Sequence, residues 1–166
     1  MHMLIRGLVY ADDADEALVA AKADVFEPLV ADGVFDYYVT ADVDGRGVSG
    51  TDRWGDYPAV APGDGDEGRD LVEDGWQYTV DEYDRALDQV EEFLDEYNRS
   101  ALWTDGAAHM EYSFPFRKVG ESAGPTTFLY ERHGRGVCCR DDLDQLLAND
   151  YDRDGDLYVV PADVHY

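Results

Sequence analysis

The chain has 166 residues, of which 38 are acidic and 13 are basic, and its formal net charge is −25 at pH 7. Only two of the basic residues are lysines, Lys22 and Lys118. So strong a negative charge argues against DNA, RNA or anionic membranes as partners of the bulk surface. Disorder of the whole chain is also disfavoured, because 45% of the residues are hydrophobic, 13% are aromatic and the apolar residues recur periodically.

The acidic composition predicts the environment in which the protein works. Like charges repel one another in dilute buffer and oppose compaction, whereas the Debye length falls to about 3 Å near 1 M salt. The excess of aspartate over lysine resembles that of cytosolic proteins from salt-in extreme halophiles. We therefore expect a protein of extreme-halophile type that gains stability in molar salt.

Other features favour a cytoplasmic, single-domain protein. No apolar run approaches the roughly 18 residues of a membrane span, and the first residues lack the basic stretch and cleavage site of a signal peptide. A disulfide between the adjacent Cys138 and Cys139 would close a strained ring, so a reducing compartment fits best. The length predicts one domain over residues 1–166.

The first elements predict a βαβ unit. Residues 3–10 are apolar and rich in β-formers, which indicates a strand. Asp12 and Asp13 are N-cap candidates, and Glu16 completes a capping box with Asp13. Apolar residues continue at helical spacing up to Gly33, a C′ stop. Residues 34–42 predict a second strand, parallel to the first and reached by a right-handed crossover.

The middle of the chain predicts a loop region and then a long helix. Residues 43–66 are rich in Gly, Asp and Pro, which indicates a mobile loop with a short strand over residues 57–61. One long amphipathic helix is predicted over residues 68–99, and the alternative is two helices that break near residues 75–79. We expect its apolar stripe to face the core, with Asp84, Asp88, Glu91 and Asp95 in solvent; a homodimer contact along residues 76–97 is the alternative. The stripe consists of Val72, Trp76, Val80, Tyr83, Leu87, Val90, Leu94 and Tyr97.

The last third predicts a hairpin, a helix and a strand. Residues 109–119 alternate and contain Pro115, which favours an edge strand. Residues 126–132 predict a strand that continues as a hairpin through Val137 and Cys138, followed by a short helix over residues 141–148 and a strand over residues 157–160. The fold class is therefore α+β: a mixed sheet that starts with a βαβ unit, one long amphipathic helix and a C-terminal hairpin–helix–strand extension. The element order is compatible with a ferredoxin-like core.

One part of the sequence is basic. Residues 112–140 carry a net charge of +3, whereas the segments before and after carry −21 and −7. Guanidinium groups bind carboxylate or phosphate in bidentate fashion, so this basic segment predicts an anion-binding or partner-binding patch. The alternative is that each base forms an ordinary ion pair with the acidic surface. The candidate residues are Arg117, Lys118, Arg132, His133, Arg135 and Arg140.

A second motif resembles the opening of a calcium loop. Asp150, Asp152, Asp154 and Asp156 alternate with other residues around Gly155, but Pro161 stands where the closing glutamate belongs. Because aspartate is so frequent in this chain, we expect an ordinary acidic turn, with at most weak binding of Ca²⁺ or a monovalent cation. The sequence requires no cofactor.

The cysteines and histidines form the third candidate. His133, Cys138, Cys139 and His165 would converge if the last strand paired with the hairpin. Either thiol could act as a nucleophile activated by His133 and the nearby arginines, and Cys138 is the candidate. The alternative is a buried, inert cysteine, and adjacent cysteines chelate zinc poorly.

The sequence contains neither a P-loop nor an H-E-x-x-H motif. We therefore expect a binding or assembly module that takes a protein partner or a small anionic ligand through the basic segment. The alternative is an enzyme for a small phosphorylated or carboxylated substrate, in which Arg132, Arg135 and Arg140 hold the anion and His133 is the acid–base group. A catalytic His133 would lie in a concave pocket, whereas a docking surface would be flat.

Overall fold

The computed structural model describes residues 2–40, 51–97, 100–106 and 127–165. These residues form an α+β fold with a mixed six-stranded sheet of order β2-β6-β1-β4-β5, in which β3 also pairs with β6. In chain order the elements are β1 (His2–Ala11), α1 (Ala14–Ala20), the π-helical turn η1 (Ala21–Phe26), α2 (Glu27–Ala31), β2 (Tyr37–Val39), α3 (Thr51–Trp54), β3 (Ala61–Pro62), α4 (Asp66–Glu96), α5 (Ala101–Thr104), β4 (Leu129–Glu131), the 3₁₀ turn η2 (Arg132–Gly134), β5 (Arg135–Gly136), α7 (Arg140–Leu147) and β6 (Asp156–His165).

The predicted cap residues begin and end the first helical segment. The Glu16 backbone N–H donates to Asp13 Oδ1 at 2.9 Å, while Glu16 Oε2 accepts from the Asp12 backbone N–H at 2.9 Å. α1, η1 and α2 then run on without interruption to Ala31, and Gly33 follows with a positive φ of 71°. The sequence prediction of a capped helix is confirmed.

β1 and β2 are parallel but are not neighbours. Each pairs antiparallel with β6, which lies between them. β2 is also shorter than predicted, covering only residues 37–39. The expected βαβ unit is therefore a split one, because the last strand of the chain enters between its two strands.

β6 is longer than the sequence predicted. It covers ten residues instead of residues 157–160, and it includes Pro161. The Arg6 backbone N–H donates to the Phe128 carbonyl of the β4 side at 2.9 Å, so Arg6 and its partner Pro161 form a non-hydrogen-bonded pair. The missing N–H of Pro161 thus faces the other side, where β3 ends its pairing at Val159 and β2 begins at Asp163. This gap explains how a proline fits in a central strand.

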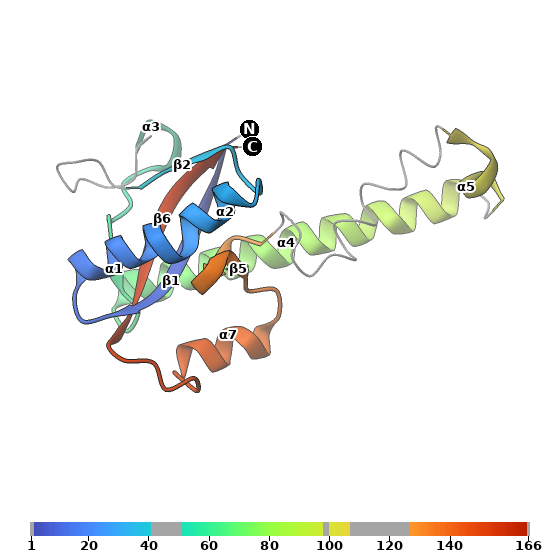
Figure 1. The fold of residues 1–166 in the computed structure, drawn as a ribbon. Coiled ribbons are helices and arrows are strands. Elements are labelled where there is room, and N and C mark those ends of the chain that lie inside the picture. The colour runs from blue at the N-terminus through green and yellow to red at the C-terminus, as the bar shows by residue number, and fades with distance from the viewer. Residues whose placement is uncertain (1, 41–50, 98–99, 107–126, 166) are drawn as a thin grey trace.

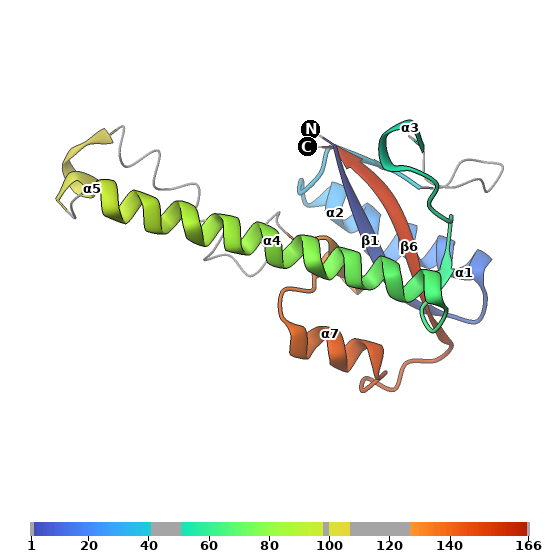
Figure 2. The same cartoon turned by 180° about the vertical axis from the view of Figure 1, so that it is seen from behind.

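Helices cover both faces of the sheet (Figures 1 and 2). One core lies under α1, η1 and α2 and includes Ile5, Phe26 and Val160. A second core lies under α4 and α7 and includes Leu8 and Leu143. In β1 the side chains of Met3, Ile5 and Val9 belong to the first core and Leu8 belongs to the second, as the pleat of a strand requires.

The long helix is confirmed as one unbroken element, α4, of 31 residues. Its first half packs closely on the sheet at Gly75, where an added Cβ would lie 2.6 Å from Leu129 Cδ2 and 3.1 Å from Arg6 Cδ. Its second half reaches beyond the sheet in both views (Figures 1 and 2). The prediction that Leu87 and Leu94 are buried is wrong, since they are 44% and 48% exposed; the helix is longer than the sheet that it covers.

The segment predicted as a loop over residues 43–66 contains structure in its described part. α3 occupies residues 51–54, and the strand expected over residues 57–61 is instead the short β3, which pairs with β6. Residues 41–50 lie outside the described residues, as does the expected strand over residues 109–119. The hairpin and α7 lie where the sequence predicted them, with shorter strands.

Candidate functional site

The three described arginines of the basic segment each have acidic partners of their own. Arg117 and Lys118 lie outside the described residues. Two of the three described arginines have a second acidic contact besides their nearest partner: Arg140 contacts Glu73 of α4 at 3.4 Å, and Arg135 contacts Glu131 at 3.5 Å. This pattern agrees with the ion-pair alternative stated above. The nearest pairs are Arg132 with Asp24 at 3.9 Å, Arg135 with Asp142 at 3.1 Å and Arg140 with Asp144 at 2.9 Å.

His133 lies on an exposed turn. Its backbone has a positive φ of 65°, and its side chain is solvent-exposed in η2. Its neighbours Arg132 and Arg135 each line a cavity, but the two cavities are different ones and His133 lines neither. Neither of these two cavities is therefore the concave site that an acid–base role of His133 would require.

The aspartate loop turns its carboxylates to solvent. Asp150, Asp152, Asp154 and Asp156 are all exposed. The loop is held instead by Asn149, whose side chain accepts from the Arg153 backbone N–H at 2.9 Å and donates to the Arg153 carbonyl at 2.8 Å. Within the described ranges, no group of three His, Cys, Asp or Glu side chains is arranged to hold a metal ion.

The condition for the cysteines to converge with His165 is not met, because the last strand does not pair with the hairpin. The hairpin of β4 and β5 lies on one side of β1 and β6 lies on the other, so His165 is not beside Cys138. Cys138 is half-buried, and burial raises the pKa of its thiol; a hydrogen bond with Tyr83 opposes this effect only in part. A raised pKa lowers the thiolate fraction, which disfavours a nucleophile.

His165 instead belongs to a cluster at the end of the sheet that sequence reasoning missed. Its ring lies 5.0 Å from the ring of His2 and stacks on Tyr37 at 5.2 Å. His2 Nδ1 lies 3.1 Å from Oδ1 of the buried Asp163, which Arg53 also approaches at 3.7 Å. Because the cluster depends on the pairing of β6 with β1 and β2, no local sequence pattern predicted it.

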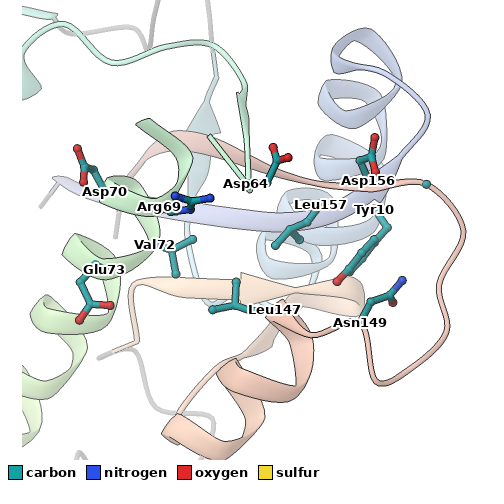
Figure 3. Close-up of a pocket in the computed structure, with 12 residues that line it drawn as sticks. Tyr10, Asp64, Arg69, Asp70, Val72, Glu73, Leu147, Asn149, Asp156 and Leu157 are labelled. Carbon is teal, nitrogen blue, oxygen red and sulfur yellow. The ribbon is translucent and has the colours of Figure 1, made fainter. Parts of the chain in front are cut away.

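A cleft of about 750 Å³ opens between the start of α4, the end of α7 and the start of β6 (Figure 3). Its apolar part is formed by Tyr10, Val72, Leu147 and Leu157. Tyr10 is fixed there, since its hydroxyl donates to the Leu146 carbonyl at 2.5 Å and the Arg153 guanidinium lies 5.8 Å from its ring centre. Burial raises the pKa of this hydroxyl, so it stays protonated and remains a donor.

The charged side chains of the cleft are mostly acidic. Four carboxylates and one guanidinium line it, and all five side chains are exposed. Arg69 contacts Asp66 at 3.8 Å, and Glu73 contacts Arg140 at 3.4 Å. Such an arrangement suits a ligand with an apolar body and a cationic group. The acidic residues are Asp64, Asp70, Glu73 and Asp156.

Sequence reasoning did not find this acidic cleft. Its lining residues come from four separated parts of the chain: the end of β1, the start of α4 with the residues before it, the end of α7 with the residues after it, and the start of β6. In a chain with 38 acidic residues, a set of carboxylates is no signal by itself. Gly63 lines the cleft at a point where the chain passes close to β6, since an added Cβ would lie 2.8 Å from Leu157 Cγ.

The chain belongs to a family described as a domain of unknown function, DUF7995, whose model matches residues 1–166. No curated protein and no solved structure matches the chain. In the part of the chain that the structure describes, no helix combines the length and the apolar stretch needed to cross a membrane.

Proposed function

We propose that the protein is a binding module whose acidic cleft takes a ligand with an apolar body and one cationic group, an amine or a guanidinium. The observation that carries the proposal is the cleft itself, in which Tyr10, Val72 and Leu157 adjoin four carboxylates. Its volume of about 750 Å³ is in the usual range for small-ligand sites. The cation is either a free small molecule or a Lys or Arg side chain of a protein.

Electrostatics favour a cation over an anion in this cleft. Its lining side chains carry four negative charges against the single positive charge of Arg69, and the whole chain carries a net charge of −25. Such a field attracts cations and repels anions. Salt shortens its range, so the apolar contacts with Leu157 and Tyr10 must supply a larger part of the affinity in molar salt.

The basic segment remains the second candidate surface. Anion-binding and partner-binding roles were first predicted for Arg132, His133, Arg135 and Arg140. An incoming phosphate or carboxylate would have to displace the present acidic partners of the three arginines. The enzyme alternative, with His133 as the acid–base group, would require a pocket to form around an exposed turn. Both need a rearrangement, whereas the acidic cleft is already formed.

The proposal is tested with three matched probes: phenethylamine, the neutral phenethyl alcohol and the anionic 3-phenylpropionate. Binding is followed by NMR titration of the full chain at about 0.15 M and about 2 M KCl. We expect phenethylamine to perturb residues of the cleft and to bind more tightly than the other two. Equal binding of all three probes, or perturbation confined to other surfaces, would contradict the proposal.

Two paired variants separate the cleft from the general acidic surface. Asp64→Asn with Asp156→Asn removes two carboxylates of the cleft, whereas Asp141→Asn with Asp150→Asn removes two exposed carboxylates outside it. At about 0.5–1 kcal/mol for each exposed charge contact, the first pair should weaken phenethylamine binding roughly fivefold or more. The second pair should leave binding nearly unchanged.

The source of the cationic group is decided by a second titration. The capped peptide acetyl-Leu-Arg-Leu-amide is compared with phenethylamine under the same conditions. Tighter binding of the peptide, lost in the variant with Asp64→Asn and Asp156→Asn, would assign the cleft to a protein partner. Tighter binding of phenethylamine would assign it to a free amine.

A further inference from the structure

The second half of α4 exposes two leucines on one face. Leu87 and Leu94 are 44% and 48% exposed. They are seven residues apart, which is almost two full turns, so they lie on the same side of the helix. This part of α4 reaches beyond the sheet (Figures 1 and 2).

A different face of the same half-helix is already covered. Ala86 and Phe93, which are also seven residues apart, are 1% and 6% exposed. Their stripe lies next to that of the leucines and not on top of it, because each leucine follows its buried neighbour by one position. The leucines are therefore additional apolar surface that the packing of α4 does not use.

Acidic side chains border the two leucines along the helix. Leu87 has Asp84 three residues before it and Glu91 four residues after it, and residues at these spacings are neighbours on a helix surface. Asp88 and Asp95 extend the same border, and all four carboxylates are exposed. We call this surface, formed by Leu87, Leu94, Asp84, Asp88, Glu91 and Asp95, the leucine strip.

The charges of the leucine strip decide which partner fits it. A second copy of this chain would place four carboxylates against four carboxylates. Like charges on two helices in contact repel each other and destabilise the helix pair. A basic helix would instead place ammonium or guanidinium groups against them. Apolar residues that are seven positions apart lie on one side of a helix and can form a common seam with a second helix.

We infer that the leucine strip is a docking surface for a basic amphipathic helix of another protein, whose apolar residues contact Leu87 and Leu94 and whose Lys or Arg residues face Asp84, Asp88, Glu91 and Asp95. This site is separate from the acidic cleft. The cleft involves only the first turns of α4, up to Glu73, whereas the strip begins at Asp84. The two proposals can therefore fail independently.

The probe is a synthetic peptide of three Leu-Lys-Lys-Leu-Ala-Lys-Lys heptads, titrated into the full chain by calorimetry. The control peptide has Glu in place of every Lys. Measurements use the lowest KCl concentration at which circular dichroism finds the chain folded, and are repeated at about 2 M KCl. We expect the basic peptide to bind and the acidic peptide not to bind at the lower salt concentration.

Variants then test whether the strip is the surface used. Leu87→Ser combined with Leu94→Ser removes the apolar contacts and keeps every charge, so it separates docking from general attraction to an acidic protein. We expect this pair to weaken peptide binding tenfold or more at both salt concentrations. Val19→Ser is the matched control, because Val19 is 66% exposed on α1, and it should leave binding unchanged.

Three outcomes would overturn the inference. The first is absence of binding by the basic peptide. The second is equal binding by the wild type and by the variant with Leu87→Ser and Leu94→Ser. The third is a dimer of the wild type in sedimentation that this same variant abolishes, since the strip would then be occupied by a second copy of the chain.

Discussion

The guanidinium carbon of Arg6 lies 5.6 Å from the centre of the Tyr78 ring, beneath α4. Arg6 has no exposed surface. Its Nη1 donates to the Leu4 carbonyl at 2.9 Å, while Nε and Nη2 are buried without a hydrogen-bond partner among the described residues. Burial lowers the pKa of this guanidinium, and Tyr57 and Asp74 offset that effect only in part. Strand β1 thus holds a buried cation that the described residues do not neutralise.

The first prediction is that Arg6→Met stabilises the protein. Arg6 forms no ion pair with a carboxylate among the described residues, and Asp74 offsets the cost of its burial only in part. An apolar side chain of similar length removes that desolvation penalty while filling the space. We expect the free energy of unfolding to rise by about 1 kcal/mol or more in chemical denaturation. Arg6→Ala is the control, and the cavity it leaves should lower the free energy of unfolding. A loss of stability in Arg6→Met would mean that the charge has a stabilising partner.

The second prediction separates the two halves of the apolar pattern. Leu87→Ala should lower the free energy of unfolding by no more than about 1 kcal/mol, because Leu87 is 44% exposed. Leu8→Ala should lower it by roughly 2–5 kcal/mol, because Leu8 is fully buried between the sheet and α4. Equilibrium denaturation of both variants checks the difference. Similar losses in the two would indicate that Leu87 is buried in solution, for example in an oligomer.

The third prediction concerns the two adjacent cysteines. Because burial raises the pKa of the Cys138 thiol, its thiolate fraction at pH 8 is lower than in the unfolded chain. Iodoacetamide should therefore modify Cys138 much more slowly in the folded protein than in denaturant, and its rate should keep rising above pH 9. Cys139 is exposed and should be modified first. Mass spectrometry of Cys138→Ser and Cys139→Ser gives the two rates, and faster modification of Cys138 would contradict the assignment.

The fourth prediction follows from the net charge. Raising KCl from about 0.1 M to about 2 M should increase the melting temperature markedly, because screening weakens the repulsion among 38 acidic residues. Differential scanning calorimetry over this range measures the effect. A melting temperature that stays constant or falls would contradict the halophilic interpretation.

The sequence by itself determined the features that depend on neighbouring residues. The capping box of Asp13 and Glu16, the stop at Gly33 and the single long helix α4 follow from side chains within a few positions of one another. Their physical causes are local hydrogen bonds, backbone freedom and helical spacing, which a one-dimensional pattern records. The strand β1 and the helix α7 were predictable for the same reason.

Only the tertiary structure decided how these elements meet. The ten-residue pairing of β6 with β1 set the order of the sheet and placed β6 between the two strands of the βαβ unit. It also places His165 beside His2, on the side of β1 away from the hairpin that leads to the cysteines. It also explains Pro161, which reads locally as a strand breaker but faces a gap between β2 and β3. The acidic cleft and the exposure of Leu87 and Leu94 depend on where α4 crosses the sheet and where the sheet ends. The position of α4 on the sheet is fixed by packing between segments far apart in the chain. Because acidic residues are spread over the whole sequence, no local pattern shows which of them come together in the folded protein.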